Sequence, residues 1–272
     1  MTQDRVLTPA ETERYARHLA LAEVGEAGQR RLVNARVLIV GVGALGSPAA
    51  LYLAAAGVGT IGLADHDRVR LSNLQRQIVH STIGIEHLKV ETAAQALHAL
   101  NPQVVLEAHP VMVDERNATG LLSRYDVIVD GTDSFNARYL LSDAAYLLRK
   151  PLVHGSIFRI EGQVTVFMPG HGCYRCLYPE PPPPGAIEEA QQVGIFSALP
   201  GVIGTIQAAE VIKVITGSGE PLVNRVLLHD ALAMTFREVR YRRNALCPLC
   251  GERPTIHQLL DYQAFVGVGT DR

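Results

Sequence analysis

Short β-forming runs alternate with segments of helical character over the first half of the chain. Arg36–Val40 (RVLIV) is a continuous run that stops at a glycine, which is typical of a buried parallel strand. Thr8 and Glu11 form a capping box with a proline between them, which predicts that a helix begins there. The pattern also predicts strands at Val58–Ala64, Val104–Ala108, Val127–Val129 and Leu152–Val153, and helices at Gln29–Val33, Pro48–Ala56, Ile85–Leu100 and Ser134–Leu148. Such alternation indicates a parallel sheet covered on both faces.

The pattern changes after Gly155. The strand predicted at Gly162–Met168 follows the previous strand so closely that the two are expected to pair antiparallel. A stiff tract, Pro179–Pro184, then leads into a predicted long mobile loop, Gly185–Ser197. The last predicted elements are a helix at Pro200–Thr216 and strands at Val226–His229 and Phe236–Arg242. We therefore expect an α/β fold with a Rossmann-like mixed β-sheet and helices on both faces.

All of this is expected to form a single domain over residues 1–272, without internal repeats. Its parts are N-terminal helices at 8–33, an alternating half at 36–150, a second half at 151–250 and a tail at 251–272. The longest apolar stretch, Ala198–Thr216, is interrupted by Gln207, Glu210 and Lys213. We therefore expect a buried or amphipathic helix there rather than a membrane span.

Composition restricts the possible classes of function. Among its 272 residues the chain has 25 Lys and Arg against 27 Asp and Glu, a net charge of −2, and no Trp. This balance argues against a protein that coats nucleic acid or stacks on bases. The charged N-terminus lacks the apolar segment of a secretory signal, so we expect a cytoplasmic protein.

The sequence GVGALG, from Gly41 to Gly46, lies between a predicted strand and a predicted helix. Glycine lets the backbone approach a phosphate group, and a helix N-terminus offers free N–H donors. Asp65 ends the next predicted strand, where a carboxylate can accept hydrogen bonds from ribose hydroxyls. These residues alone fit NAD and ATP equally well.

The residues that follow favour a triphosphate. Arg76 ends the segment SNLQR, and Lys89 lies in the next predicted helix. Two cations and the amide of Asn73 suit a triphosphate better than a dinucleotide, because a guanidinium can grip phosphate oxygens with two hydrogen bonds. Either cation taken singly is equally consistent with an ordinary solvated surface.

Asp133 ends the segment DGTD at the predicted carboxyl edge of the sheet, where ligands bind in open α/β sheets. A carboxylate there can hold Mg²⁺ against phosphate oxygens. The alternative is that Asp130 or Asp133 caps the helix predicted at Ser134. The chain has neither a P-loop lysine motif nor a GxSxG nucleophile motif.

The four cysteines form two C-x-x-C pairs, Cys173 with Cys176 and Cys247 with Cys250. Without an export signal, such pairs favour metal ligands over disulfides, and four thiolates make the closed shell of a structural Zn²⁺ site. A thioredoxin-like redox motif is the alternative, which we disfavour because neither pair is expected to start a helix after a strand.

The histidines show no spacing that marks a catalytic group or a metal ligand. We expect His18, His80 and His154 to be surface residues or core residues with satisfied hydrogen bonds.

Taken together, these segments resemble the MoeB/ThiF/HesA family of ubiquitin-activating-enzyme-like adenylyltransferases. The match covers roughly residues 7–250, in the order and spacing of the family. It rests on RYARH (14–18), GVGALG (41–46), LADHD (63–67), LSNLQRQ (71–77), DGTD (130–133), EGQVTVF (161–167), CYRC (173–176), GVIGTIQAAEVIK (201–213) and CPLC (247–250).

The resemblance implies a homodimer that uses ATP and Mg²⁺ to adenylate the C-terminal glycine of a ubiquitin-like sulfur-carrier protein of the MoaD or ThiS type. It implies catalytic roles for Arg76, Lys89 and Asp133, and for Arg17 reaching the ATP of the partner subunit. The nucleotide-binding residues that it implies are Gly41, Gly43, Ala44, Gly46, Asp65, Asp67, Ser72, Asn73, Gln75, Arg76, Lys89, Asp133 and Ser134. Residues 178–197 match the family's crossover loop, over which the carrier's tail is threaded.

One departure from the family concerns covalent chemistry. Several members carry a cysteine in the crossover loop, and the matching position here is Ala190. Because the other cysteines are all assigned to zinc, we expect the enzyme to stop at the acyl-adenylate. Sulfur would then come from a separate persulfide donor, since no rhodanese-like extension is present in the sequence.

Two alternatives from other classes stay open. An NAD-dependent oxidoreductase shares the glycine loop and Asp65, but it gives no reason for Arg76, Lys89 or the cysteine pairs. A non-catalytic scaffold for a ubiquitin-like partner is the second alternative, and it has no need for Asp65, Arg76, Lys89 and Asp133 together. The pathway also stays open among molybdopterin, thiamine and tRNA thiolation.

Overall fold

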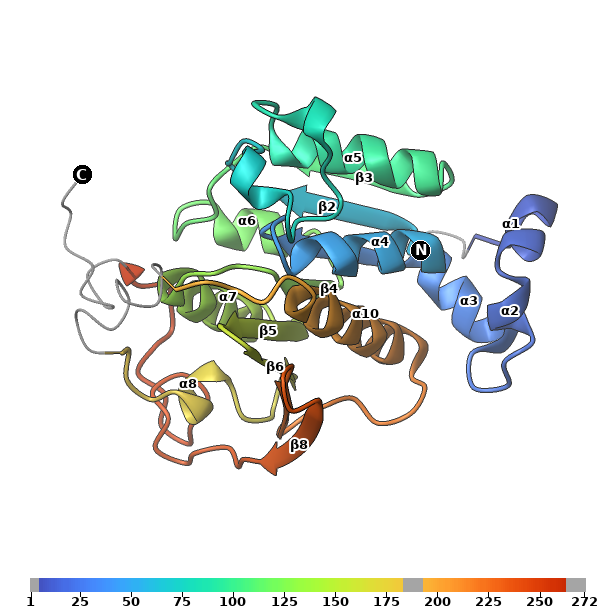
Figure 1. The fold of residues 1–272 in the computed structure, drawn as a ribbon. Coiled ribbons are helices and arrows are strands. Elements are labelled where there is room, and N and C mark those ends of the chain that lie inside the picture. The colour runs from blue at the N-terminus through green and yellow to red at the C-terminus, as the bar shows by residue number, and fades with distance from the viewer. Residues whose placement is uncertain (1–4, 183–192, 263–272) are drawn as a thin grey trace.

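The computed structural model describes residues 5–182 and 193–262, and its centre is one eight-stranded sheet (Figure 1). The strand order is β3-β2-β1-β4-β5-β6-β7-β8, with parallel pairing from β3 to β5 and antiparallel pairing from β5 to β8. The strands are β1 (Arg36–Val40), β2 (Thr60–Ala64), β3 (Val105–His109), β4 (Val127–Asp130), β5 (Leu152–Phe158), β6 (Glu161–Phe167), β7 (Arg225–Asp230) and β8 (Thr235–Arg240). The expected Rossmann-like mixed sheet is confirmed.

Strand β1 explains why helices cover both faces. Its alternate residues point to opposite sides, so Val37 and Ile39 join one apolar core while Leu38 joins the other. The first face carries α3 (Gly25–Asn34), α4 (Gly46–Ala56), α5 (Lys89–Leu100) and α10 (Leu199–Thr216), and the second carries α6 (Ala118–Leu122) and α7 (Phe135–Leu147) (Figure 1). The remaining helices are α1 (Pro9–Arg14), α2 (Ala16–Leu19) and α8 (Tyr174–Leu177), with single 3₁₀ turns at Leu71–Asn73 and Thr82–Gly84.

Helix α10 is long and apolar enough to cross a membrane by length and composition alone. In the fold it packs against α4, β5 and β6 instead (Figure 1). Its interrupting polar residues have partners in this core: Gln207 donates to the carbonyls of Asp130 and Val153, and Glu210 accepts from the N–H of Leu222. The helix therefore has the buried character expected from its polar positions.

Several predicted boundaries are wrong for local reasons. The helix predicted at Ile85–Leu100 begins only at Lys89, because Glu86 has a φ of 67° and its N–H donates to the carbonyl of Val69. The strand predicted at Leu152–Val153 runs on to Phe158, since its polar residues are buried against the rest of the fold. Helices α6 and α8 are too short to give a periodic signal. Most of the predicted loop Gly185–Ser197, including Ala190, lies outside the described residues.

The loops after β1 and β4 meet where the order of the strands reverses. Gly41 has a φ of 85°, a left-handed conformation that favours glycine. A Cβ at Gly46 would lie 2.0 Å from the carbonyl oxygen of Gly41, and a Cβ at Gly131 would lie 2.4 Å from the same atom. Only glycine fits these contacts, and together they form the floor of the crevice where open α/β sheets bind ligands.

We therefore expect Gly46→Ala to lower the free energy of unfolding by about 1–3 kcal/mol, because the new methyl group must displace the backbone of Gly41. Gly120→Ala is the matched control, since it lies in α6 and a Cβ there would meet nothing within 4 Å. It should raise the stability by about 0.5–1 kcal/mol. Urea denaturation measures both, and equal stabilities of the two variants would contradict the packing argument.

Candidate functional site

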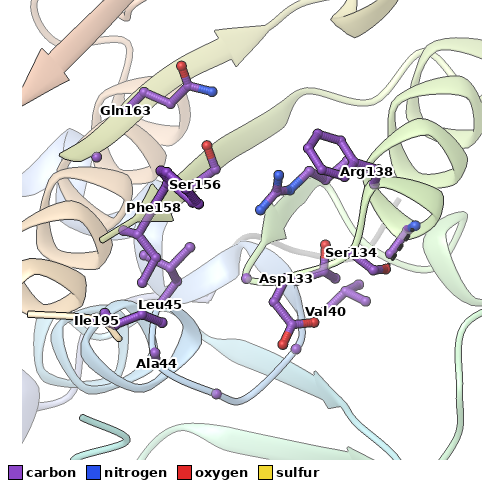
Figure 2. A pocket seen from close by; sticks show the side chains of 18 of the residues that line it. Val40, Ala44, Leu45, Asp133, Ser134, Arg138, Ser156, Phe158, Gln163 and Ile195 are labelled. Carbon is purple, nitrogen blue, oxygen red and sulfur yellow. Dashed lines mark hydrogen bonds between the residues drawn. The ribbon is translucent and has the colours of Figure 1, made fainter. Parts of the chain in front are cut away.

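A cavity of about 1140 Å³ opens at the carboxyl ends of β1, β2 and β4 and continues over β5–β8 (Figure 2). It exceeds the roughly 300–1,000 Å³ of a single small-molecule site, so it has room for a nucleotide and part of a second substrate. Ten of the residues predicted to bind nucleotide line it: Gly41, Gly43, Ala44, Asp65, Asp67, Gln75, Arg76, Lys89, Asp133 and Ser134. Gly46, Ser72 and Asn73 lie outside the lining, although Gly46 shapes the loop beneath it.

Asp65 holds the glycine loop in place. Its two carboxylate oxygens accept hydrogen bonds from the backbone N–H groups of Val42 at 2.9 Å and Asp67 at 2.8 Å. His80 supports the same loop from the other side, with Nε2 2.9 Å from the carbonyl oxygen of Val42 and Nδ1 2.8 Å from Thr92 Oγ1. Burial lowers the pKa of His80, so the ring is neutral at physiological pH and serves as a core residue, as expected.

Lys89 enters the cavity from the start of α5. It is buried, and its Nζ lies 2.7 Å from Oδ2 of Asp67. Burial would raise the pKa of Asp67, but the hydrogen bond and charge of Lys89 outweigh burial and hold the pKa below its ordinary value. Lys89 is thus a fixed cation with a partner rather than part of a solvated surface.

The segment 71–77 forms the wall next to Lys89. Arg76 is partly exposed, lines the cavity and donates one hydrogen bond to the carbonyl of Ser72 at 3.2 Å. Asn73 turns inward on its own segment and accepts a hydrogen bond from the N–H of Arg70. Asn73 therefore shapes the turn in this structure, while Arg76 faces the cavity.

Asp133 and Ser134 mark the start of α7. The cap of this helix is Ser134, whose Oγ accepts a hydrogen bond from the N–H of Ala137 at 3.3 Å. The alternative in which Asp133 caps the helix is therefore wrong. Its carboxylate is exposed at the cavity (Figure 2) and forms no hydrogen bond within the described residues, so it is available to a cation.

Asp130, in the same segment, has a different role. Its Oδ2 lies 2.7 Å from Nδ1 of His154, and both side chains are almost completely buried. The other oxygen accepts hydrogen bonds from the N–H and hydroxyl of Thr132. Burial opposes ionisation, but the hydrogen bond and charge of His154 outweigh it and lower the pKa of Asp130. The pair fixes the end of β4, and no sequence signal pointed to it.

The individual residues of the second wall of the cavity were not predicted, although Tyr178 lies in the segment matched to the crossover loop. Gln163 on β6 and Tyr178 after α8 join through their side chains, with Gln163 Nε2 2.7 Å from the Tyr178 hydroxyl oxygen. Further lining residues come from α7, β5, β7 and β8 and include Arg138, Ser156, Phe158, His229, Asp230 and Arg237. These residues lie far apart in the sequence, and only the tertiary structure brings them together.

The four cysteines meet outside this cavity. All four are free thiols whose Sγ atoms lie within 4.8 Å of one another, with Cys173 and Cys247 at 3.6 Å and Cys176 and Cys250 at 3.2 Å. A hydrogen bond from Cys173 lowers the pKa of Cys176 to about 6, and thiolates are the form that binds metal. Such a donor set fits a tetrahedral metal ion.

The first cysteine pair does start a helix, because Cys173 is the N-cap of α8. The expectation that neither pair stands at such a position was wrong, since α8 is only four residues long. The redox alternative gains nothing from this, because Cys173, Cys247 and Cys250 are buried and converge with Cys176. Next to the cluster, Arg175 and Tyr262 both donate to the buried Asp143, which attaches the tail to α7.

One other predicted site residue, Arg17, falls outside the cavity. Arg17 is an exposed residue of α2 and is not part of the lining. The crossover position, Ala190, lies among the residues that the structure does not describe.

Solved structures share this fold. The crystal structure of E. coli MccB with ATP has a TM-score of 0.79 at 23% identity, covering 90% of this chain and 76% of that chain. Selenomethionine PaaA has a TM-score of 0.75 at 24% identity, covering 88% of this chain and 76% of its own. At this identity the likeness establishes the fold.

Curated relatives are much more similar in sequence. The sulfur carrier protein adenylyltransferase of Thermus thermophilus is 48% identical over 267 residues, which cover 96% of this chain and 98% of that protein. The adenylyltransferase and sulfurtransferase MOCS3 of Anopheles gambiae is 46% identical over 96% of this chain and 60% of its own length. The probable adenylyltransferase/sulfurtransferase MoeZ of Mycobacterium tuberculosis is 44% identical over 97% of this chain and 67% of its own length.

None of these three relatives is named as an oxidoreductase. Their names confirm the predicted enzyme class, an adenylyltransferase, and the predicted resemblance. The ThiF family model matches residues 15–249, so this chain belongs to the ThiF family.

Proposed function

We propose that this chain uses ATP and Mg²⁺ to adenylate the C-terminal glycine of a ubiquitin-like sulfur-carrier protein and releases pyrophosphate. The observation that carries the proposal is one cavity that joins a glycine loop and Asp65 to a second wall on β5–β8. The first part suits a nucleotide, and the second offers a path for an extended peptide.

Within this cavity the nucleotide would lie over the glycine loop, with Asp65 near the ribose. Arg76 and Lys89 would hold phosphate oxygens, and Asp133 would bind Mg²⁺ because its carboxylate has no other partner within the described residues. The metal would neutralise charge on the phosphate groups.

The reaction needs no general base, because the carrier's C-terminal carboxylate is already the nucleophile. One of its oxygens attacks the α-phosphorus, a new O–P bond forms, and the bond to pyrophosphate breaks with its electron pair leaving on pyrophosphate. The chain contributes in-line positioning and cations that face the developing charge. A NAD-dependent oxidoreductase or a non-catalytic scaffold would leave the Lys89–Asp67 pair and Asp133 without a purpose.

Carrier-dependent exchange of pyrophosphate into ATP tests this function. Exchange should appear with the correct carrier among those of the molybdopterin, thiamine and tRNA-thiolation pathways of the same organism, and should be absent without it. Absence of exchange with every carrier would refute the adenylation proposal.

Arg76→Ala should lower the exchange rate by about 100–1,000-fold, as removal of one preorganised charge facing the transition state does. Arg124→Ala is the control, because Arg124 precedes β4, pairs with Glu107 at 3.0 Å and lies outside the cavity lining. It should change the rate by less than about twofold. Full exchange in Arg76→Ala would show that this role is wrong.

The proposal includes a homodimer in which Arg17 serves the partner's site, since Arg17 lies on α2 outside the cavity of its own chain. Arg17→Ala and Asp133→Ala should each be inactive as homodimers. Mixed dimers of the two variants should recover one intact site, so a random mixture reaches about a quarter of wild-type activity. No recovery on co-expression would place Arg17 outside a shared site.

We also propose that the four cysteines hold a structural Zn²⁺ and that a separate persulfide donor supplies the sulfur. Elemental analysis should find one zinc per chain, and Cys247→Ser should lose it together with thermal stability. A gel after reaction with ATP and carrier should show no thiol-sensitive adduct between enzyme and carrier. A zinc-free wild type with full stability, or such an adduct, would contradict the respective assignment.

We propose the cytoplasm as the cellular location, and the core position of α10 supports this. Fractionation of cells with an antibody to the chain tests this, and recovery in a membrane or secreted fraction would refute it.

A further inference from the structure

Arg138 is a buried cation for which the described residues supply no hydrogen-bond acceptor. Its side chain belongs to a residue that is 9% exposed, its Nε is buried without a partner, and no hydrogen bond or ion pair of its guanidinium occurs in the described part of the chain. Two other buried cations differ in this respect, since Lys89 pairs with Asp67 and Arg175 pairs with Asp143. Burial of a polar nitrogen without an acceptor is unfavourable, so this guanidinium is free to hydrogen-bond an anion from outside the chain.

The position of Arg138 is set by helix α7. It follows Ser134 by one turn, so both lie on the helix face that lines the cavity. The ring of Phe135 lies 5.1 Å from the guanidinium carbon and limits its movement. Figure 2 shows the guanidinium directed into the cavity, with Ser156 and Gln163 on the facing wall.

The chain's own carboxylates do not fill this need. Asp130 is the buried acid nearest in sequence to the start of α7, and it interacts with Arg138 through charge only, because its two oxygens are taken by His154 and Thr132. Asp133 lines the cavity on the side of the glycine loop, where it is exposed and forms no ion pair or hydrogen bond with Arg138. The free guanidinium therefore faces open cavity between the nucleotide part and the second wall.

We propose that Arg138 binds the C-terminal carboxylate of the acyl substrate, an inference that rests on the proposed function. A guanidinium matches a carboxylate with two parallel hydrogen bonds, which fixes its plane. One carboxylate oxygen then attacks the α-phosphorus as the bond to pyrophosphate breaks, and the other stays on Arg138 as the carbonyl oxygen of the acyl-adenylate. The charged carboxylate thus marks the end of the tail, since a terminal glycine has no side chain that could be recognised.

Phosphate is the other anion that a guanidinium binds, but the phosphate part of the cavity already has Arg76, Lys89 and the glycine loop. Arg138 lies on the opposite helix, across from the neutral side chains of Ser156 and Gln163. An incoming peptide end is therefore the anion that the position favours.

Binding of a short synthetic peptide ending in Gly-Gly, with a free carboxylate or a C-terminal amide, tests the proposal without requiring catalysis. Wild type should prefer the carboxylate form by about 10-fold or more, as expected for a charge-assisted pair. Arg138→Met should lose this preference, and Arg138→Lys should keep part of it. ATP affinity measured without peptide should stay within about twofold in all three proteins.

Several outcomes would overturn the assignment. The first is the absence of a carboxylate preference in wild type, and the second is an unchanged preference in Arg138→Met. The third is a loss of ATP affinity in Arg138→Met with intact peptide binding, because that result would identify phosphate as the anion that Arg138 binds. A carboxylate preference that Arg138→Met abolishes, in a wild type that shows no exchange with any carrier, would keep the binding site and refute the proposed function.

Thermal unfolding separates ligand binding from a structural role. Because Arg138→Met removes no hydrogen bond and only the contact with the Phe135 ring and the charge near Asp130, it should unfold at nearly the same temperature as wild type. Arg124→Met is the matched control for loss of one arginine away from the cavity. A markedly lower unfolding temperature in Arg138→Met than in Arg124→Met would reveal an internal partner and contradict the proposal.

Discussion

The approach of two backbone loops at the end of β1 and β4 is the constraint on which the rest of the site depends. Gly41, Gly46 and Gly131 lie so close that a Cβ at either of the last two would meet the carbonyl of Gly41. This contact sets the start of α4 directly under the crevice, where its free N–H groups face a ligand. Asp65 and His80 then connect the loop to the end of β2 and to α5, so hydrogen bonds hold this side of the cavity in place.

Charge is distributed unevenly around this rigid floor. Lys89 forms an ion pair with Asp67, and His154 is hydrogen-bonded to the buried Asp130, so these contacts hold the architecture together. Asp133 and Arg138 are different, because neither has a hydrogen-bonding partner within the described residues. One is a carboxylate available to a cation and the other is a guanidinium cation available to an anion, and they lie on either side of the start of α7. This asymmetry suits a reaction between a metal-bound phosphate and a carboxylate.

The cysteine cluster holds the second wall against this floor. Cys173 starts α8, Tyr174 and Tyr178 of that segment line the cavity, and Cys247 and Cys250 join from the end of the chain. The buried contacts of Asp143 with Arg175 and Tyr262 add a second attachment beside the thiols. The second wall is thus supported by long-range contacts, whereas the glycine loop is supported mainly by neighbours in the parallel sheet.

This difference explains what the sequence by itself determined. The mixed sheet, the glycine loop, Asp65, Lys89 and the four cysteines follow from local patterns, because a buried strand, a tight turn and a C-x-x-C pair each leave their mark within a few residues. Tertiary structure alone decided the Asp130–His154 pair, the join of Gln163 to Tyr178 and the isolation of Arg138. Whether a side chain finds a hydrogen-bonding partner depends on residues that are far apart in the chain, and a local sequence pattern does not show which of them meet in the fold.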